Sequence, residues 1–123
     1  MIAFASRTGN VRYIVSKLSL PAVEINDQSE ISEPFLLFTY TDGLGAVPPH
    51  VRQFMDKNGA NCYGVVVSGN SNFGSQNFGR AGEIISTEWS IPLVRKLEVR
   101  GFPEDYAAIQ HYYEQYVRRE QTA

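Results

Sequence analysis

Two stretches of the chain are apolar without interruption, residues 35–38 (FLLF) and residues 65–67 (VVV). Strands that are covered on both faces have continuous runs of this kind, whereas a strand with one solvated face alternates apolar and polar residues. Sheets covered on both faces are mostly parallel, and parallel neighbours are joined by long, usually helical connections. These two runs therefore favour an α/β fold with a parallel sheet.

The rest of the chain alternates between short apolar runs and longer amphipathic segments. Strands are predicted at residues 2–5, 22–25, 35–40, 63–68 and 93–99. Helices are predicted at residues 11–18, 48–58, 79–88 and 104–119. In the last helix, the spacing predicts that one side is formed by Tyr106, Ile109, Tyr113, Tyr116 and Val117. Residues 26–34 are polar, so we expect an exposed connection without a full helix.

Strands that alternate with helices form right-handed crossovers, which place helices on both faces of one parallel sheet. The 123 residues suit a single domain, residues 1–123, because dividing the chain would leave two marginal cores. Five strands fit a three-layer, doubly wound sheet in the order 2-1-3-4-5. In such folds the ligand lies beyond the carboxyl ends of the strands, at the switch point between strands 1 and 3.

The composition limits the classes of function. A net charge of −2 and the absence of a dense Lys/Arg run argue against nucleic-acid binding. No apolar run approaches the ~20 residues of a membrane span, and no secretory signal is visible, so we expect a cytoplasmic protein. Cys62 is the only cysteine, and His50 and His111 are isolated, so neither a disulfide nor a metal site is expected.

The first predicted strand runs directly into the polar sequence SRTGN, residues 6–10. The helix that follows leaves backbone N–H groups unpaired at its start, and its dipole favours an anion. Ser6 and Thr8 add hydroxyl donors, and Gly9 allows a close approach, so the loop could hold a phosphate. Alternatively, Thr8 or Asn10 only caps the helix. The loop is neither a Walker motif, since no GK[ST] follows, nor a GxGxxG dinucleotide motif.

Two further polar loops follow the third and fourth predicted strands. Residues 39–48 (TYTDGLGAVP) contain two glycines, Gly43 and Gly45, which have two interpretations. They form an ordinary turn, or they let the backbone lie against a flat ligand and let a peptide group change its orientation. In residues 68–79 (SGNSNFGSQNFG), Phe73 is a candidate for stacking on a ring, whereas Phe78 could belong to the core. All three loops fall at the same edge of a parallel sheet. Together they predict a pocket with a phosphate seat and a planar, polar-edged slot, which is the shape of FMN.

These motifs resemble those of the NrdI family, the small flavodoxin-like proteins that serve the class Ib manganese ribonucleotide reductase. The S-x-T-G-N loop is shared with flavodoxins generally. The resemblance also includes LPAVEI (20–25), DGLGAVP with VRQFM after it, and the highly specific SGNSNFG…FGRAGEIIS (68–86). It covers nearly the whole chain and implies a flavodoxin-like fold with FMN as cofactor.

The resemblance implies three groups of FMN-binding residues. The phosphate would lie on Ser6, Arg7, Thr8, Gly9, Asn10 and Val11; the ring would be bordered near N5 by Thr41, Gly43, Leu44 and Gly45; and its other side would be lined by Ser68, Gly69, Asn70, Asn72, Phe73, Gly74 and Phe78.

In the NrdI family, reduced FMN reacts with oxygen, and the oxidant passes to the manganese-bound small subunit, where it generates the metal–tyrosyl radical cofactor. The resemblance therefore implies an accessory redox flavoprotein rather than a conventional turnover enzyme. Its implied partners are the reductase small subunit and a flavin reductant. The long acidic and aromatic loops of ordinary flavodoxins are missing here. With fewer negative charges around the ring, the anionic reduced flavin should be destabilised less. The missing loops should also leave a path for oxygen.

Two other interpretations fit the same fold. A generic short-chain electron-transfer flavodoxin shares the cofactor and differs in its electron acceptor. A phosphoacceptor receiver domain has the same strand order, but its Mg²⁺ site needs acidic residues at the end of the first strand. Phe4, Ala5 and Ser6 stand there instead, so the sequence disfavours a receiver domain.

Overall fold

The computed structural model describes residues 1–118 of the chain. Its strands are β1 (Ile2–Phe4), β2 (Ala22–Glu24), β3 (Phe35–Tyr40), β4 (Cys62–Gly69) and β5 (Leu93–Glu98). Its α-helices are α1 (Asn10–Ser16), α2 (Pro49–Asn58), α3 (Arg80–Trp89) and α4 (Pro103–Tyr112). The 3₁₀ turns η1 (Gly59–Asn61) and η2 (Ser71–Phe73) flank β4, and the π-helical stretch η3 (Tyr113–Val117) continues α4.

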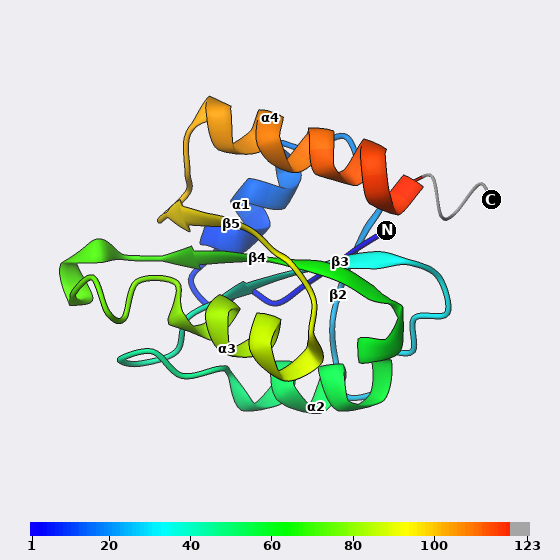
Figure 1. Cartoon of the computed structure of the whole chain (residues 1–123), viewed down its shortest axis with the longest axis horizontal. Coiled ribbons are helices and arrows are strands. Elements are labelled where there is room, and N and C mark those ends of the chain that lie inside the picture. The colour runs from blue at the N-terminus through cyan, green and yellow to red at the C-terminus, as the bar shows by residue number, and fades with distance from the viewer. Residues whose placement is uncertain (119–123) are drawn as a thin grey trace.

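The five strands pair in parallel in the order β2-β1-β3-β4-β5, as the sequence predicts. Figure 1 shows three layers, with α1 and α4 on one face of the sheet and α2 and α3 on the other. The carboxyl ends of the strands point to one side of the molecule, on the left in Figure 1, where the loops after β3 and β4 project. The doubly wound α/β fold is therefore confirmed.

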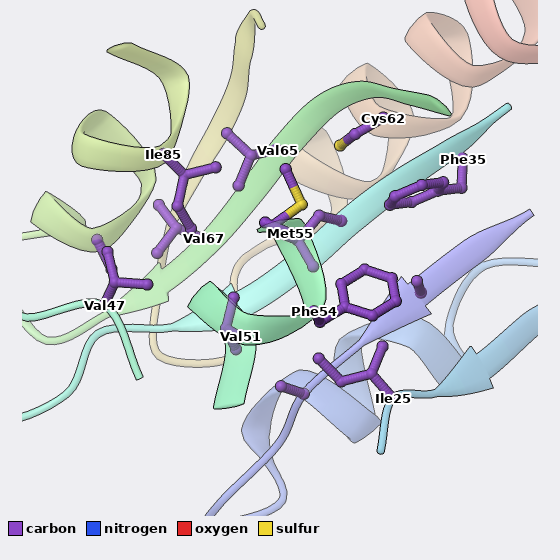
Figure 2. Close-up of a cluster of buried hydrophobic side chains, with 14 residues drawn as sticks. Ile25, Phe35, Val47, Val51, Phe54, Met55, Cys62, Val65, Val67 and Ile85 are labelled. Atoms are coloured by element: carbon purple, nitrogen blue, oxygen red, sulfur yellow. The ribbon is translucent and has the colours of Figure 1, made fainter. Parts of the chain in front are cut away.

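The face of the sheet under α2 and α3 is filled by aliphatic and aromatic side chains (Figure 2). The rings of Phe35 and Phe54 meet edge to face, with their centres 5.6 Å apart. Met55 projects from α2 toward the sheet and has no exposed surface. Gly82 lets α3 approach β4 closely, because an added Cβ there would lie 2.6 Å from Cγ1 of Val67. This tight packing gives the loops beyond the strands a rigid base.

The opposite face is covered by α1 and α4. Successive residues of β3 are buried on opposite sides, with Phe35 and Leu37 under α2 and α3, and Leu36 and Phe38 in the cluster with Ile14. This two-sided burial is the physical reason why residues 35–38 are apolar without interruption.

The predicted boundaries differ from the observed ones by a residue or two, except in the last helix. There α4 ends at Tyr112 and a π-helical stretch follows, and residue 119 of the predicted helix lies outside the described residues. Tyr113 and Val117 remain buried, but Tyr116 is 56% exposed. The prediction that Tyr116 shares the side of Tyr113 is therefore wrong.

The connection between β2 and β3 contains no helix within residues 25–34, as predicted. The side chain of Asn58 holds this connection against the end of α2. Its Oδ1 accepts a hydrogen bond from the N–H of Ile31 (2.8 Å), and its Nδ2 donates to the carbonyl of Ser29 (3.1 Å).

Candidate functional site

An open cleft lies beyond the carboxyl ends of the strands. Its walls come from the loops after β1, β3 and β4 and from the turn after β5. The lining residues are Arg7, Thr8, Asn10, Tyr40, Thr41, Gly43, Ser68, Gly69, Asn70, Phe73, Asn77 and Val99. The cleft coincides with the switch between β1 and β3, where doubly wound folds bind their ligands.

The loop after β1 leads into α1 through a left-handed glycine. Gly9 has a φ of 94°, a conformation that residues with a Cβ rarely adopt. The hydroxyl of Ser6 accepts a hydrogen bond from the backbone N–H of Arg12 (3.3 Å), so Ser6 supports the first turn of α1. The Thr8 side chain is exposed, and the rest of the described chain leaves it free for a ligand.

The loop after β3 is a tight reversal. The backbones of Asp42 and Ala46 exchange two hydrogen bonds of 2.8 Å, and Gly43 and Gly45 between them have φ values of 50° and 121°. A Cβ at Gly43 would meet nothing within 4 Å, whereas one at Gly45 would lie 2.7 Å from Cδ of Arg80. Gly43 therefore borders open space at the cleft, while Gly45 is needed for close packing against α3.

The hydroxyl of Thr41 lies in the same wall of the cleft. Its Oγ1 is buried and has no hydrogen-bond partner within residues 1–118. Buried polar groups are nearly always hydrogen-bonded, because leaving one unsatisfied costs about 1–3 kcal/mol. Since Thr41 lines the cleft, a polar atom of a bound ligand is the natural partner of this hydroxyl.

The loop after β4 is held in shape by its own amide side chains. Oδ1 of Asn70 accepts a hydrogen bond from the N–H of Asn72 (2.9 Å), and Nδ2 of Asn77 donates to the carbonyl of Phe73 (2.8 Å). The Phe73 side chain itself is 57% exposed at the cleft. The loop thus presents an aromatic ring from a backbone that is already ordered.

The turn after β5 forms the fourth wall, and the sequence analysis did not assign it to the site. Val99 has a φ of 55°, which is rare for a β-branched residue. Its N–H donates to the carbonyl of Gly69 (2.7 Å), and its carbonyl accepts a hydrogen bond from the hydroxyl of Ser68. These hydrogen bonds hold the strained turn against the end of β4.

The charge at the cleft mouth is carried by Arg7 and Asp42. Nη1 of Arg7 lies 3.8 Å from Oδ1 of Asp42, and its guanidinium carbon lies 5.4 Å from the centre of the Tyr40 ring. Burial and then the Asp42 carboxylate raise the pKa of Tyr40, and Arg7 partly opposes them. The Tyr40 phenol therefore keeps its proton at neutral pH. The residues that line the cleft include Arg7 but no carboxylate.

The structure brings about half of the residues predicted from sequence into the lining of the cleft. They are Arg7, Thr8, Asn10, Thr41, Gly43, Ser68, Gly69, Asn70 and Phe73. The other predicted residues lie outside the lining; they are Ser6, Gly9, Val11, Leu44, Gly45, Asn72, Gly74 and Phe78.

The predicted residues outside the lining include two with clear structural roles. Val11 is 2% exposed and belongs to the core cluster between the sheet and α1. The Phe78 ring packs behind Gly69, where an added Cβ would lie 3.1 Å from it. Conversely, Tyr40, Asn77 and Val99 line the cleft without having been predicted.

Comparison with protein-family models matches residues 2–111 to the family described as NrdI flavodoxin-like. The chain belongs to the NrdI flavodoxin-like family. Protein NrdI of Macrococcus caseolyticus is 42% identical over 106 residues, covering 85% of this chain and 81% of that relative. Protein NrdI of Rhizobium leguminosarum is 37% identical and covers 98% of this chain and 97% of its own length. The family resemblance stated from sequence is thus confirmed.

A solved structure supports the fold of this NrdI-family chain. A short-chain flavodoxin associated with a bacterial microcompartment superimposes with a TM-score of 0.73, at 18% identity, over 97% of this chain and 96% of its own. At this identity the likeness shows the flavodoxin-like fold alone. Fold and family together imply a flavin cofactor for this chain.

Within residues 1–118, no helix is long and apolar enough to cross a membrane. Within the same residues, no group of three His, Cys, Asp or Glu side chains is arranged to hold a metal ion.

Proposed function

We propose that the cleft binds FMN, with the phosphate on residues 6–11 and the ring between residues 41–45 and 68–78. The observation that carries this proposal is the buried, unpartnered hydroxyl of Thr41 in the cleft of a NrdI-family chain. Thr8 and Asn10 offer neutral donors on the side of β1. Tyr40 and Phe73 offer aromatic surfaces to a planar ring. FMN, when bound, supplies the redox chemistry of the site.

The residues around the proposed ring suit transfer of electrons to oxygen. The loop after β3 is short, and its tip residue Leu44 is 71% exposed, so this side of the cleft stays open. Arg7 lines the cleft, and its charge is partly offset by the Asp42 carboxylate, 3.8 Å away at the cleft mouth. This single ion pair should disfavour an anionic reduced ring less than a cluster of unpaired carboxylates would. The protein therefore acts as an accessory flavoprotein that makes an oxidant, superoxide or peroxide, from oxygen.

The partner we propose is the small subunit of the class Ib manganese ribonucleotide reductase, in which the oxidant forms the dimanganese–tyrosyl radical cofactor. Family membership supports this partner, and the exposed loops support the docking face. Leu44 and Phe73 project from the two loops at the cleft mouth. Docking there shortens the path of the oxidant to the metal site. A separate reductant supplies the electrons to the flavin. Because ribonucleotide reductase is the proposed partner, we also propose a cytoplasmic location for the protein.

The alternative is a short-chain flavodoxin that passes electrons to another protein. To separate the two, the FMN-loaded protein is reduced without air and mixed with air-saturated buffer, with and without the dimanganese small subunit. We expect rapid reoxidation, formation of a complex and generation of the tyrosyl radical. Slow reoxidation with no complex would favour the electron-transfer flavodoxin.

A further inference from the structure

Arg100, in the turn after β5, reaches across to the loop after β1. Its Nε donates a hydrogen bond to Oδ1 of Asn10 (3.1 Å), and its guanidinium carbon lies 4.3 Å from the centre of the Tyr13 ring on α1. The carbonyl of Arg100 accepts a hydrogen bond from the hydroxyl of Tyr106 on α4. Arg100 is thus held by both its backbone and its side chain. The preceding residue, Val99, lines the cleft.

The contact with Arg100 determines which way the Asn10 amide faces. A guanidinium only donates hydrogen bonds, so the amide atom beside it must be the oxygen. The NH₂ group of Asn10 has no partner within residues 1–118, and Asn10 lines the cleft. Its two N–H donors are therefore left for a ligand. The unpartnered hydroxyl of Thr41 in the same cleft independently points to a polar ligand there.

We infer that Arg100 is a positioning residue for the phosphate group of the cofactor, which it serves by fixing the Asn10 amide with its N–H donors toward the cleft. The inference rests on the proposed function, since the ligand is taken to be a phosphate monoester. Without Arg100 the amide is free to rotate and to present its oxygen. Amide and phosphate oxygens are both acceptors, so that orientation would weaken phosphate binding.

Lys17 provides a matched control for Arg100. Its Nζ lies 4.9 Å from the centre of the same Tyr13 ring, and the side chain is exposed. Arg100→Leu and Lys17→Leu each remove one positive charge beside Tyr13. Only Arg100→Leu also removes the donor to Asn10.

The test compares FMN with riboflavin, which lacks the phosphate, by titration of flavin fluorescence. Arg100→Leu should weaken FMN binding about tenfold, because hydrogen bonds to charged groups are strong, and should leave riboflavin binding within about twofold. Lys17→Leu should change neither affinity beyond about twofold. In the Asn10→Ala variant, the additional Arg100→Leu substitution should weaken FMN binding by less than a further factor of about two, because the two residues act as one unit.

Several results would overturn the inference. An equal loss of FMN and riboflavin affinity would show a merely structural role, and an equal loss in Lys17→Leu would show a general effect of charge. Additive losses in the double variant would show that Arg100 does not act through Asn10. If thermal unfolding shows that the Arg100→Leu protein does not fold, the Arg100→Gln variant replaces it in the test. Arg100→Gln keeps a side-chain N–H donor and should therefore retain part of the preference for FMN over riboflavin.

The inference and the proposed function fail in distinguishable ways. If the wild-type protein binds neither flavin, both are wrong. If the wild-type protein binds FMN and Arg100→Leu binds it equally well, only the role of Arg100 is wrong.

Discussion

At the scale of single residues, Thr8 tests the phosphate loop with the least disturbance. Its side chain is exposed and makes no hydrogen bond within the described chain, so Thr8→Val should leave the fold intact. Loss of one donor to a phosphate costs about 1.5–3 kcal/mol, or roughly tenfold or more in FMN affinity. Fluorescence titration measures this loss, with Thr87→Val on the exposed side of α3 as the control. Unchanged affinity in Thr8→Val would reject the phosphate assignment.

The buried thiol of Cys62 leads to a prediction about the pH dependence of its reactivity and of the stability of the fold. Burial raises the pKa of its thiol to about 12, against roughly 8.5 in an unfolded chain. The native thiol should therefore react with a thiol-specific reagent at pH 8 far more slowly than the thiol of the denatured protein. Because the folded pKa is the higher one, this contribution to stability is full below about pH 8.5 and is lost as the pH rises toward 12. Fast labelling of the native protein at pH 8 would contradict the buried position.

Residues with an unusual sequence pattern are the ones that the structure places in the lining of the cleft, and their role in FMN binding stays a prediction. Thr8, Gly43 and Phe73 stand out because hydroxyls, glycines or aromatics occupy polar loops, and all of them line the cleft. Val99 could not be found in this way, because its role depends on a left-handed backbone that valine does not signal. For Phe78 the sequence leaves both a core position and the ring side open; its ring lies 3.1 Å from an added Cβ at Gly69 and outside the lining of the cleft.

At the scale of elements, the loop of residues 41–46 is a candidate for movement coupled to the redox state. Gly43 has a φ of 50°, and glycine tolerates both signs of φ, so the peptide between Gly43 and Leu44 can change its orientation at little steric cost from Gly43 itself. Reduced FMN carries a proton on N5, and the rotated carbonyl would accept a hydrogen bond from this N5–H. Gly43→Val should hinder this rotation and lower the potential of the first one-electron reduction by on the order of 40 mV, since one hydrogen bond contributes about 1 kcal/mol.

The potential is measured by reductive titration followed by absorbance. Crystals of the oxidised and reduced wild-type protein, with the redox state verified, give the direct comparison of the peptide. The same backbone in both states would contradict the predicted rotation.

The elements themselves were predictable to different degrees. The helix boundaries at Pro49 and near Asn58-Gly59 follow from residues with strong local preferences. The π-helical stretch after Tyr112 has no such signal, and a helix assumed to be regular places Tyr116 on the wrong side. Its geometry depends on packing against the sheet and not on local preference.

At the scale of the whole molecule, the proposed complex makes a prediction about surfaces. Hydrogen exchange should show protection of residues 41–46 and 68–79 when the reductase small subunit binds, because loops on a rigid sheet are common recognition sites. Asn72→Trp and Ser75→Trp, both at exposed positions, should weaken the complex about tenfold or more. Glu30→Lys, in the exposed connection between β2 and β3, should leave it intact. Protection of residues 103–117 with both loops spared would contradict the docking face.

The strand order was the most predictable feature of the molecule. Alternating strands and helices, continuous apolar runs and right-handed crossovers together leave few topologies, and the observed order β2-β1-β3-β4-β5 is the predicted one. The same topology indicates where a ligand binds. It does not indicate which side chains of four separate loops meet there, because the turn conformations depend on long-range contacts such as that between Arg100 and Asn10.

Whether this chain carries FMN is measured most directly by the absorption spectrum of the purified protein, together with the identity and amount of the flavin released on denaturation. We expect a yellow protein that holds, or takes up from solution, one FMN per chain. Reductive titration should bleach the spectrum, and air should restore it. A colourless protein that takes up no FMN would contradict the proposed binding of FMN in the cleft.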